Sequence, residues 1–174
     1  EAADISVNRT SSDKQTFGGL IGTYLSDNTS NSLTISGISV SADNSAGGAE
    51  YFGGLIGKAD DDSYIRLENV SVSASGCKNV TSFGGIAGYA DKAFIDAENV
   101  TVNTNGDFIG GGVIGNMNGG VLRLGGTTDL TGTKAAGGGQ IIGTRGAALI
   151  YAKNGWQLIR GEAASFDDIG TWGE

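Results

Sequence analysis

The sequence predicts an all-β chain that folds as a right-handed parallel β-helix, a solenoid of about five coils with three short strands per coil. Two observations lead to this fold. A glycine-rich segment that first reads Phe-Gly-Gly-Leu-Ile-Gly at residues 17–22 occurs five times, and stretches of alternating β-branched and polar residues follow each copy. Repeats of this kind are typical of solenoids, whose units bury their apolar faces against one another. The right-handed sense follows from the general rule for crossovers between parallel strands.

The glycine-rich segment sets the period of the repeat. Counted from the first glycine of each pair, its copies begin at residues 18, 53, 84, 111 and 138, at intervals of 35, 31, 27 and 27 residues. Paired glycines suit a corner of the coil where φ is positive, or a position where a side chain would clash with the coil above. The glycines that we assign to this structural role are Gly18, Gly19, Gly22, Gly53, Gly54, Gly57, Gly84, Gly85, Gly88, Gly111, Gly112, Gly115, Gly138, Gly139 and Gly143.

Two alternating stretches follow the glycine-rich segment and predict two further strands. The first is represented by residues 33–35 and 65–67, and the second by residues 38–41 and 70–73. Such alternation predicts strands with one face in the core, and no segment of helical period lies between them. Strands of successive coils would stack about 4.8 Å apart, with Val, Ile and Leu pointing inward and Ser, Thr and Asn facing water.

The repeats define a single domain over residues 1–174. Residues 1–16 are expected to form a partial first coil, because Ile5-Ser6-Val7 matches the second alternating stretch with its valine in the place of Val40. Residues 17–150 hold the repeats. Residues 151–174 are irregular and predict either a cap over the open end of the solenoid or a linker to a following domain. Large aromatic residues stand in this tail where earlier repeats carry small ones, at Trp156, Phe166 and Trp172.

The composition argues against several classes of function. The chain has no His, the commonest general base and metal ligand, and its single cysteine, Cys77, allows neither an intrachain disulfide nor a metal site built from thiolates. The 11 basic and 19 acidic residues give a net charge of -8, which argues against a nucleic-acid partner. No apolar run is long enough for direct membrane insertion. The chain begins without Met or a leader sequence, so we expect a fragment or a processed product.

The glycine-rich segment, with its aromatic lead at Phe17, Phe52 and Phe83, resembles the GLUG repeat. The resemblance covers most of residues 17–143, is strongest in three copies, and weakens where Gly110 and Gly137 stand in place of Phe. GLUG repeats occur in secreted and surface-anchored bacterial proteins. The resemblance therefore implies a stalk or binding region of an extracellular bacterial adhesin, with flanking domains in a longer chain, and it names no ligand.

The residues expected to carry recognition lie in the longer turns of the first two repeats, at residues 24–32, 43–51 and 60–64. Extra residues in a solenoid repeat collect in loops, and loops carry recognition. Aromatic side chains there offer the surface that a glycan uses, and the acidic run, with Asp91 one repeat further on, could hold Ca²⁺ or form a solvated turn. The candidate binding residues are Tyr24, Tyr51, Tyr64, Asp60, Asp61 and Asp62.

Two alternatives use other residues of the same fold. Glu68 and Glu98 lie at the same place in adjacent repeats, and two carboxylates about 5 Å apart could serve a polysaccharide-cleaving enzyme. The competing interpretation is that both are solvated while the neighbouring Asn69 and Asn99 hydrogen-bond to each other at a corner. An outward hydroxyl ladder could instead order water as an ice-binding β-helix does, or be ordinary surface; its members are Ser39, Ser41, Ser71, Ser73, Thr101 and Asn103.

From these observations we expect a secreted or cell-surface module that is not an enzyme and needs no cofactor. It would bind a glycan or a host surface protein, or act as a rigid spacer in cell adhesion. The rigid-spacer role has a physical basis, because every coil of a β-helix is hydrogen-bonded to its neighbours.

Overall fold

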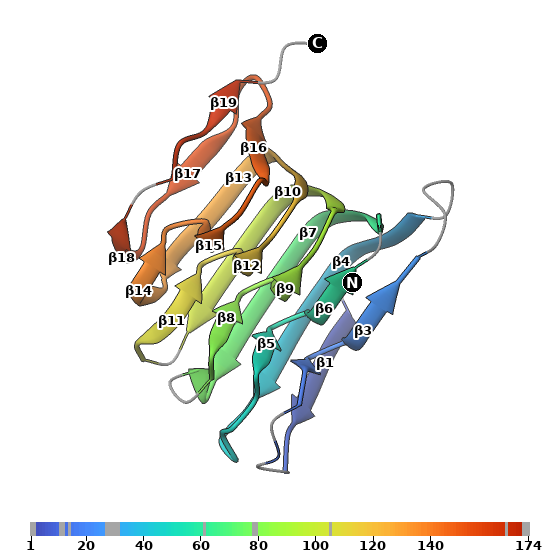
Figure 1. Cartoon of the computed structure of the whole chain (residues 1–174), viewed down its shortest axis with the longest axis vertical. Helices are drawn as coiled ribbons and strands as arrows, with labels where there is room; N and C mark the ends of the chain where they lie inside the picture. Colours follow the sequence, from blue (N-terminus) through green and yellow to red (C-terminus); the bar gives the residue numbers. More distant parts are fainter. Residues whose placement is uncertain are drawn as a thin grey trace.

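The computed structural model describes residues 3–10, 13, 15–26, 32–60, 62–77, 80–104, 106–165 and 167–171. Over these residues the chain is an all-β solenoid of about four turns, in which three parallel sheets follow the axis (Figure 1). The prediction of a parallel β-helix with three strands per coil is confirmed, with about four turns in place of five.

The first sheet, which we call the long sheet, contains the longest strands. Each of its central strands joins the two alternating stretches that the sequence analysis treated as separate strands, so that prediction was wrong in its boundaries. In spatial order the strands are β1 (Ala3–Asn8), β4 (Ser32–Asp43), β7 (Tyr64–Ser75), β10 (Ala93–Thr104), β13 (Gly120–Gly132), β16 (Leu149–Ala152) and β19 (Gly170–Thr171), and β17 (Gln157–Ile159) also pairs with β13.

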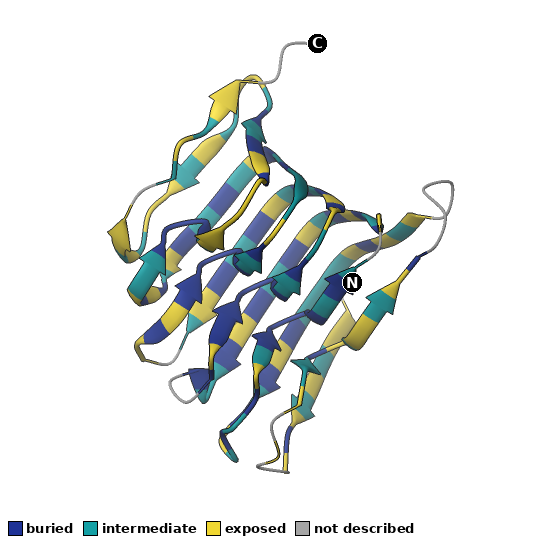
Figure 2. Cartoon of the chain, viewed as in Figure 1, coloured by how far each residue is buried: buried dark blue, intermediate teal, exposed yellow. Residues whose placement is uncertain are grey.

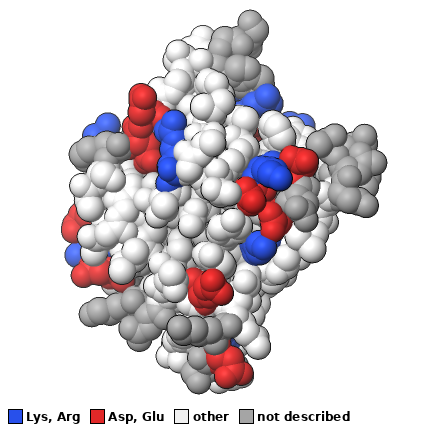
Figure 3. All heavy atoms as spheres, in the orientation of Figure 1, with Lys and Arg blue, Asp and Glu red and all other residues white. Residues whose placement is uncertain are grey.

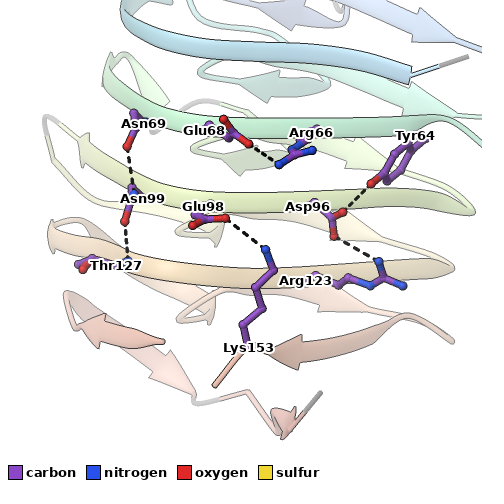
Figure 4. A network of polar contacts seen from close by, with 10 residues as sticks. All are labelled: Tyr64, Arg66, Glu68, Asn69, Asp96, Glu98, Asn99, Arg123, Thr127 and Lys153. Carbon is purple, nitrogen blue, oxygen red and sulfur yellow. Dashed lines mark hydrogen bonds and ion pairs between the residues drawn. The ribbon is translucent and has the colours of Figure 1, made fainter. Parts of the chain in front are cut away.

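The long strands bend in the middle at residues with left-handed backbone conformation. Gly37, Asn69, Asn99 and Gly126 have φ values of 63°, 54°, 53° and 58°. Glycine and asparagine tolerate this conformation best, which explains their place at the bend. Asn99 Nδ2 donates to Asn69 Oδ1 at 3.0 Å, and the backbone N–H of Thr127 donates to Asn99 Oδ1 at 3.0 Å (Figure 4). The predicted hydrogen bond between the stacked asparagines is thus confirmed, although both residues lie within long strands and not at a corner between sheets.

The other two sheets consist of short strands that come from the glycine-rich segment and the residues beside it. The second sheet has the order β18 (Glu162–Ser165), β14 (Lys134–Gly139), β11 (Phe108–Gly111), β8 (Ser82–Gly84), β5 (Tyr51–Gly53) and β2 (Phe17–Gly18). The third sheet has the order β15 (Ile142–Arg145), β12 (Ile114–Met117), β9 (Ala87–Ala90), β6 (Ile56–Asp60) and β3 (Ile21–Leu25).

The paired glycines form the corner between the second and third sheets. A Cβ on Gly84 would overlap the carbonyl oxygen of Ala87, and one on Gly85 would overlap the carbonyl oxygen of Gly112 in the next coil. Neither glycine has a positive φ. Of the two reasons that the sequence analysis gave for this glycine pair, close backbone approach is the one that applies.

The fifth copy of the segment begins one residue later than the sequence count placed it. Ile142 pairs with Ile114, so the corner positions are Gly139 and Gln140, while Gly138 precedes the corner. The sequence count matched the letters Gly-Gly, whereas the fold aligns the apolar pair that follows. Gln140 is 2% exposed, and its side-chain amide has no hydrogen-bond partner among the described residues.

The core consists of apolar columns that run along the axis between the sheets. Along the long strands, buried residues alternate with exposed ones (Figure 2). A ladder of four phenylalanine rings runs through this core, with centroid distances of 5.0 Å from Phe17 to Phe52, 5.1 Å from Phe52 to Phe83 and 4.8 Å from Phe83 to Phe108. Although Gly110 replaces the expected aromatic residue in the fourth repeat, Phe108 places its ring in the same column.

The first and last coils continue the stack. In β1, Ile5 pairs with Val40 and Val7 with Ala42, so the predicted alignment of Val7 with Val40 is off by two residues, which leaves the inward face unchanged. In the tail, Trp156 packs against the core, and Asp167 accepts hydrogen bonds from the backbone N–H groups of Ile141 at 2.7 Å and Ile142 at 3.3 Å. Phe166 and Trp172 lie outside the described residues.

Candidate ligand-binding groove on the long sheet

The outward side chains of the long sheet form three neighbouring columns before the bend. The pairing of β7, β10, β13 and β16 fixes which residues share a column, because equivalent residues of successive coils lie directly beside one another. The first column is apolar or aromatic, with Tyr64, Phe94, Val121 and Leu149; the second holds Arg66, Asp96, Arg123 and Tyr151; the third holds Glu68, Glu98 and Gly125.

Ion pairs connect the charged residues of these columns (Figure 4). Arg66 lies 2.6 Å from Glu68 on the same strand, and Arg123 lies 3.7 Å from Asp96 on the neighbouring strand. Lys153 follows β16 and reaches back to Glu98 at 3.2 Å. It can do so because Gly125 has no side chain, and a Cβ at that position would lie 3.0 Å from Lys153 Cδ.

Tyr64 is held in place at the border of this network. Its hydroxyl donates to Asp96 Oδ2 at 2.7 Å. This hydrogen bond, together with desolvation and the charge of Asp96, raises the pKa of Tyr64 above its usual value. A fixed ring next to fixed charges is the kind of preorganised surface that loses little side-chain entropy when a ligand binds.

The side chains enclose a shallow groove of about 240 Å³ on the outside of the solenoid. Its ion-paired side chains keep between 19% and 55% of their surface exposed, so their polar atoms can still contact a ligand. The groove is lined by Tyr64, Arg66, Leu67, Glu68, Asp96, Ala97, Glu98, Arg123 and Lys153.

Glu68 and Glu98 lie in this groove and pair directly in register, as the sequence predicted. Each carboxylate is turned toward a cation of its own, Arg66 for Glu68 and Lys153 for Glu98 (Figure 4). The two carboxylates therefore take part in separate ion pairs.

The three tyrosines chosen from the sequence lie on three different sheets and do not form one surface. Tyr24 belongs to β3 of the third sheet and packs half-buried against the core, while residues 27–31 of its turn lie outside the described residues. Tyr51 belongs to β5 of the second sheet, and Tyr64 begins β7 of the long sheet. Among the three, Tyr64 alone lines the groove.

Tyr51 belongs to a second aromatic cluster. Its ring lies 4.8 Å from that of Tyr89, and Lys58 Nζ lies 5.4 Å from the centre of the Tyr89 ring. Burial raises the pKa of both tyrosines. The sequence analysis missed Tyr89 and Lys58, although both directly follow the third glycine of their repeats and therefore share a column.

The acidic run is only partly described. Lys58 lies 2.6 Å from Asp60, Asp62 is exposed with φ of 57°, and Asp61 lies outside the described residues. Asp91 accepts a hydrogen bond from Asn118 Nδ2 at 3.1 Å. Within the described part of the chain, no group of three or more His, Cys, Asp or Glu side chains could hold a metal ion. The Ca²⁺ site stays a prediction.

The hydroxyl ladder lies on the long sheet beyond the bend. Ser39, Ser71 and Thr101 share one column, and Ser41, Ser73 and Asn103 share the next. Asp4 and Asp129 continue the first column at its two ends, so the hydroxyl face is bordered by charge. The hydrogen bond from the Thr131 hydroxyl lowers the pKa of Asp129.

Charge elsewhere on the molecule is scattered. On the face shown in Figure 3, acidic and basic side chains are interspersed, and much of the surface carries neither.

No helix among the described residues is long and apolar enough to cross a membrane. No protein-family model, no curated protein and no solved structure matches the chain, so the resemblance to the GLUG repeat stays a prediction from the sequence.

Proposed function

We propose that this chain is a non-catalytic recognition module of an extracellular bacterial adhesin, in which the β-helix is a rigid scaffold and the groove of the long sheet contacts the partner. One observation carries the proposal: side chains from four successive coils, brought together only by the register of the sheet, meet in one groove of ion-paired and aromatic groups. Polar and aromatic side chains that are held on a rigid sheet and exposed in a groove are better suited to binding a ligand than to packing in a core.

The scaffold supports this role. Each coil is hydrogen-bonded to its neighbours on all three sheets, and buried apolar residues form one continuous cluster between them. Neighbouring coils therefore hold one another in place, and the spacing between groove residues is set by the backbone pairing. A surface of this kind keeps its shape at the end of a longer extracellular chain.

Polysaccharide cleavage is less well supported by the geometry. The two stacked carboxylates are each engaged by a different cation, Arg66 for Glu68 and Lys153 for Glu98. Ice binding has one observation in its favour, the two hydroxyl columns in register. Inhibition of ice recrystallisation by micromolar protein, lost in a Ser71→Tyr variant, would support that alternative; its absence would eliminate it.

The proposal is tested by displaying the chain on cells that do not adhere and measuring their attachment to glycan-coated and matrix-protein-coated surfaces. A Phe94→Ala, Arg123→Gln double variant removes one aromatic group from the column that borders the groove and one charged group from the groove itself. The matched control is Ile109→Ala, Lys134→Gln, which changes an exposed apolar residue and a residue of a surface ion pair on the second sheet. Attachment should be lost with the groove variant alone. Equal attachment of both variants would contradict the proposal.

A further inference from the structure

We propose that the groove of the long sheet binds an uncharged oligosaccharide with adjacent hydroxyl groups. This inference rests on the proposed function and names the chemical class of ligand for the same site. It is carried by the arrangement of charges and hydrogen-bonding atoms in the groove, which Figure 4 shows, and by the apolar side chains beside it.

The groove is locally neutral although the protein is acidic. Three cationic side chains, Arg66, Arg123 and Lys153, stand against three anionic ones, which gives a formal local charge of zero, whereas the whole chain carries -8. A polyanion would meet an unfavourable long-range field without a basic groove to compensate it. A polycation would have to break ion pairs that are already formed. An uncharged ligand meets neither cost.

Hydrogen-bond donors and acceptors alternate within the groove. In the second column, the guanidinium groups of Arg66 and Arg123 stand on either side of the Asp96 carboxylate. Arginine and lysine only donate hydrogen bonds, and carboxylates only accept them, whereas a hydroxyl group does both. Two adjacent sugar hydroxyls can therefore bridge a neighbouring donor and acceptor, and charged partners make these hydrogen bonds stronger than neutral ones.

An apolar border completes the site. Phe94 and Leu149 are 37% and 45% exposed in the column that Tyr64 begins, directly beside the charged column. Large apolar side chains exposed next to fixed polar groups are typical of ligand sites. Sugar rings have faces of C–H groups that pack on aromatic rings while the hydroxyls at their edges reach polar atoms. A rod-like oligosaccharide lying along the columns would use both features at once.

The inference is tested with purified protein and defined saccharides. Uncharged malto-, cello-, xylo- and mannooligosaccharides are compared with oligogalacturonides and sialyllactose, first on an array and then by titration calorimetry. We expect binding to at least one uncharged series, and we expect Phe94→Ala and Arg123→Gln each to weaken it by about tenfold or more, because each loses one ring contact or one charged hydrogen bond. Ile109→Ala and Lys134→Gln should leave it unchanged.

Three outcomes would overturn the inference. They are binding of the acidic saccharides alone, binding of uncharged saccharides that neither groove variant weakens, and no saccharide binding by the folded protein. In the last of these outcomes, the displayed chain can still attach to a protein-coated surface, and the groove variant can still abolish that attachment. The ligand class is then wrong, and the recognition proposal stands. If the groove variants alter no attachment at all, both proposals fail.

Discussion

The phenylalanine ladder should contribute strongly to stability, and most strongly at its centre. Phe83 is fully buried and contacts two rings, that of Phe52 at 5.1 Å and that of Phe108 at 4.8 Å. Replacing a buried phenylalanine by alanine typically costs about 3–5 kcal/mol, a range that already includes lost ring contacts of about 0.5–1.5 kcal/mol each. A residue with two such contacts belongs in the upper part of this range. We therefore expect Phe83→Ala to lower the free energy of unfolding by about 4–5 kcal/mol.

Phe17 is the matched comparison, because it occupies the same column at the end of the ladder. It is half-buried and contacts one ring, that of Phe52 at 5.0 Å. Less apolar surface returns to water on truncation, so Phe17→Ala should cost about half as much as Phe83→Ala. Ile109→Ala, at a side chain 57% exposed, should change stability by less than about 0.5 kcal/mol.

Urea unfolding followed by circular dichroism measures these free energies, provided that the slope of the free energy against urea is the same for all variants. A Phe17→Ala variant as destabilised as Phe83→Ala would refute the reasoning, because the cost would then not follow burial and ring contacts. A Phe83→Ala variant within 1 kcal/mol of the unmodified chain would show that the ring column does not exist.

Three further predictions concern single positions. Gly57→Ala should destabilise the fold, since a Cβ there would overlap the carbonyl oxygen of Gly22, whereas Gly22→Ala at the equivalent position meets nothing within 4 Å and should be neutral; thermal unfolding of the pair decides this. Cys77 is buried, and desolvation raises the pKa of its thiol to about 12. The thiol should therefore resist alkylation at pH 8 in the folded protein and react once urea unfolds the chain. Rapid alkylation of the folded protein would contradict this prediction. Burial raises the pKa of Asp167 above 3.8. Its contribution to stability is therefore full below pH 3.8 and declines as the pH rises through the raised pKa. Relative to Asp167→Asn, the unmodified chain should lose stability over that pH range, and a gain in stability would contradict the direction of the pKa shift.

The sequence predicted the fold well because the solenoid repeats its physical constraints. A glycine pair recurs at the first four corners between the second and third sheets, and inward apolar residues recur where a strand faces the core. The errors arose at positions where a match in the sequence does not correspond to the same position in the fold. Gly138 matched the glycine pattern, but the apolar pair at residues 141–142 determines the register. Phe108 lies outside the aligned position, yet its ring fills the column because a long side chain can reach it.

The candidate site was predictable only in part, because its residues come from successive coils and are far apart in the sequence. Tyr64 was singled out from the sequence, while Asp96 and Arg123 were not, since nothing in their local sequence separates them from ordinary surface charges. Their meaning depends on the register that places Arg66, Asp96 and Arg123 side by side. Lys153 reaches Glu98 only because Gly125, in the coil between them, has no side chain. In a solenoid, therefore, a binding surface is found by reading equivalent positions of successive repeats as one column, and the same procedure would have joined Tyr89 to Lys58.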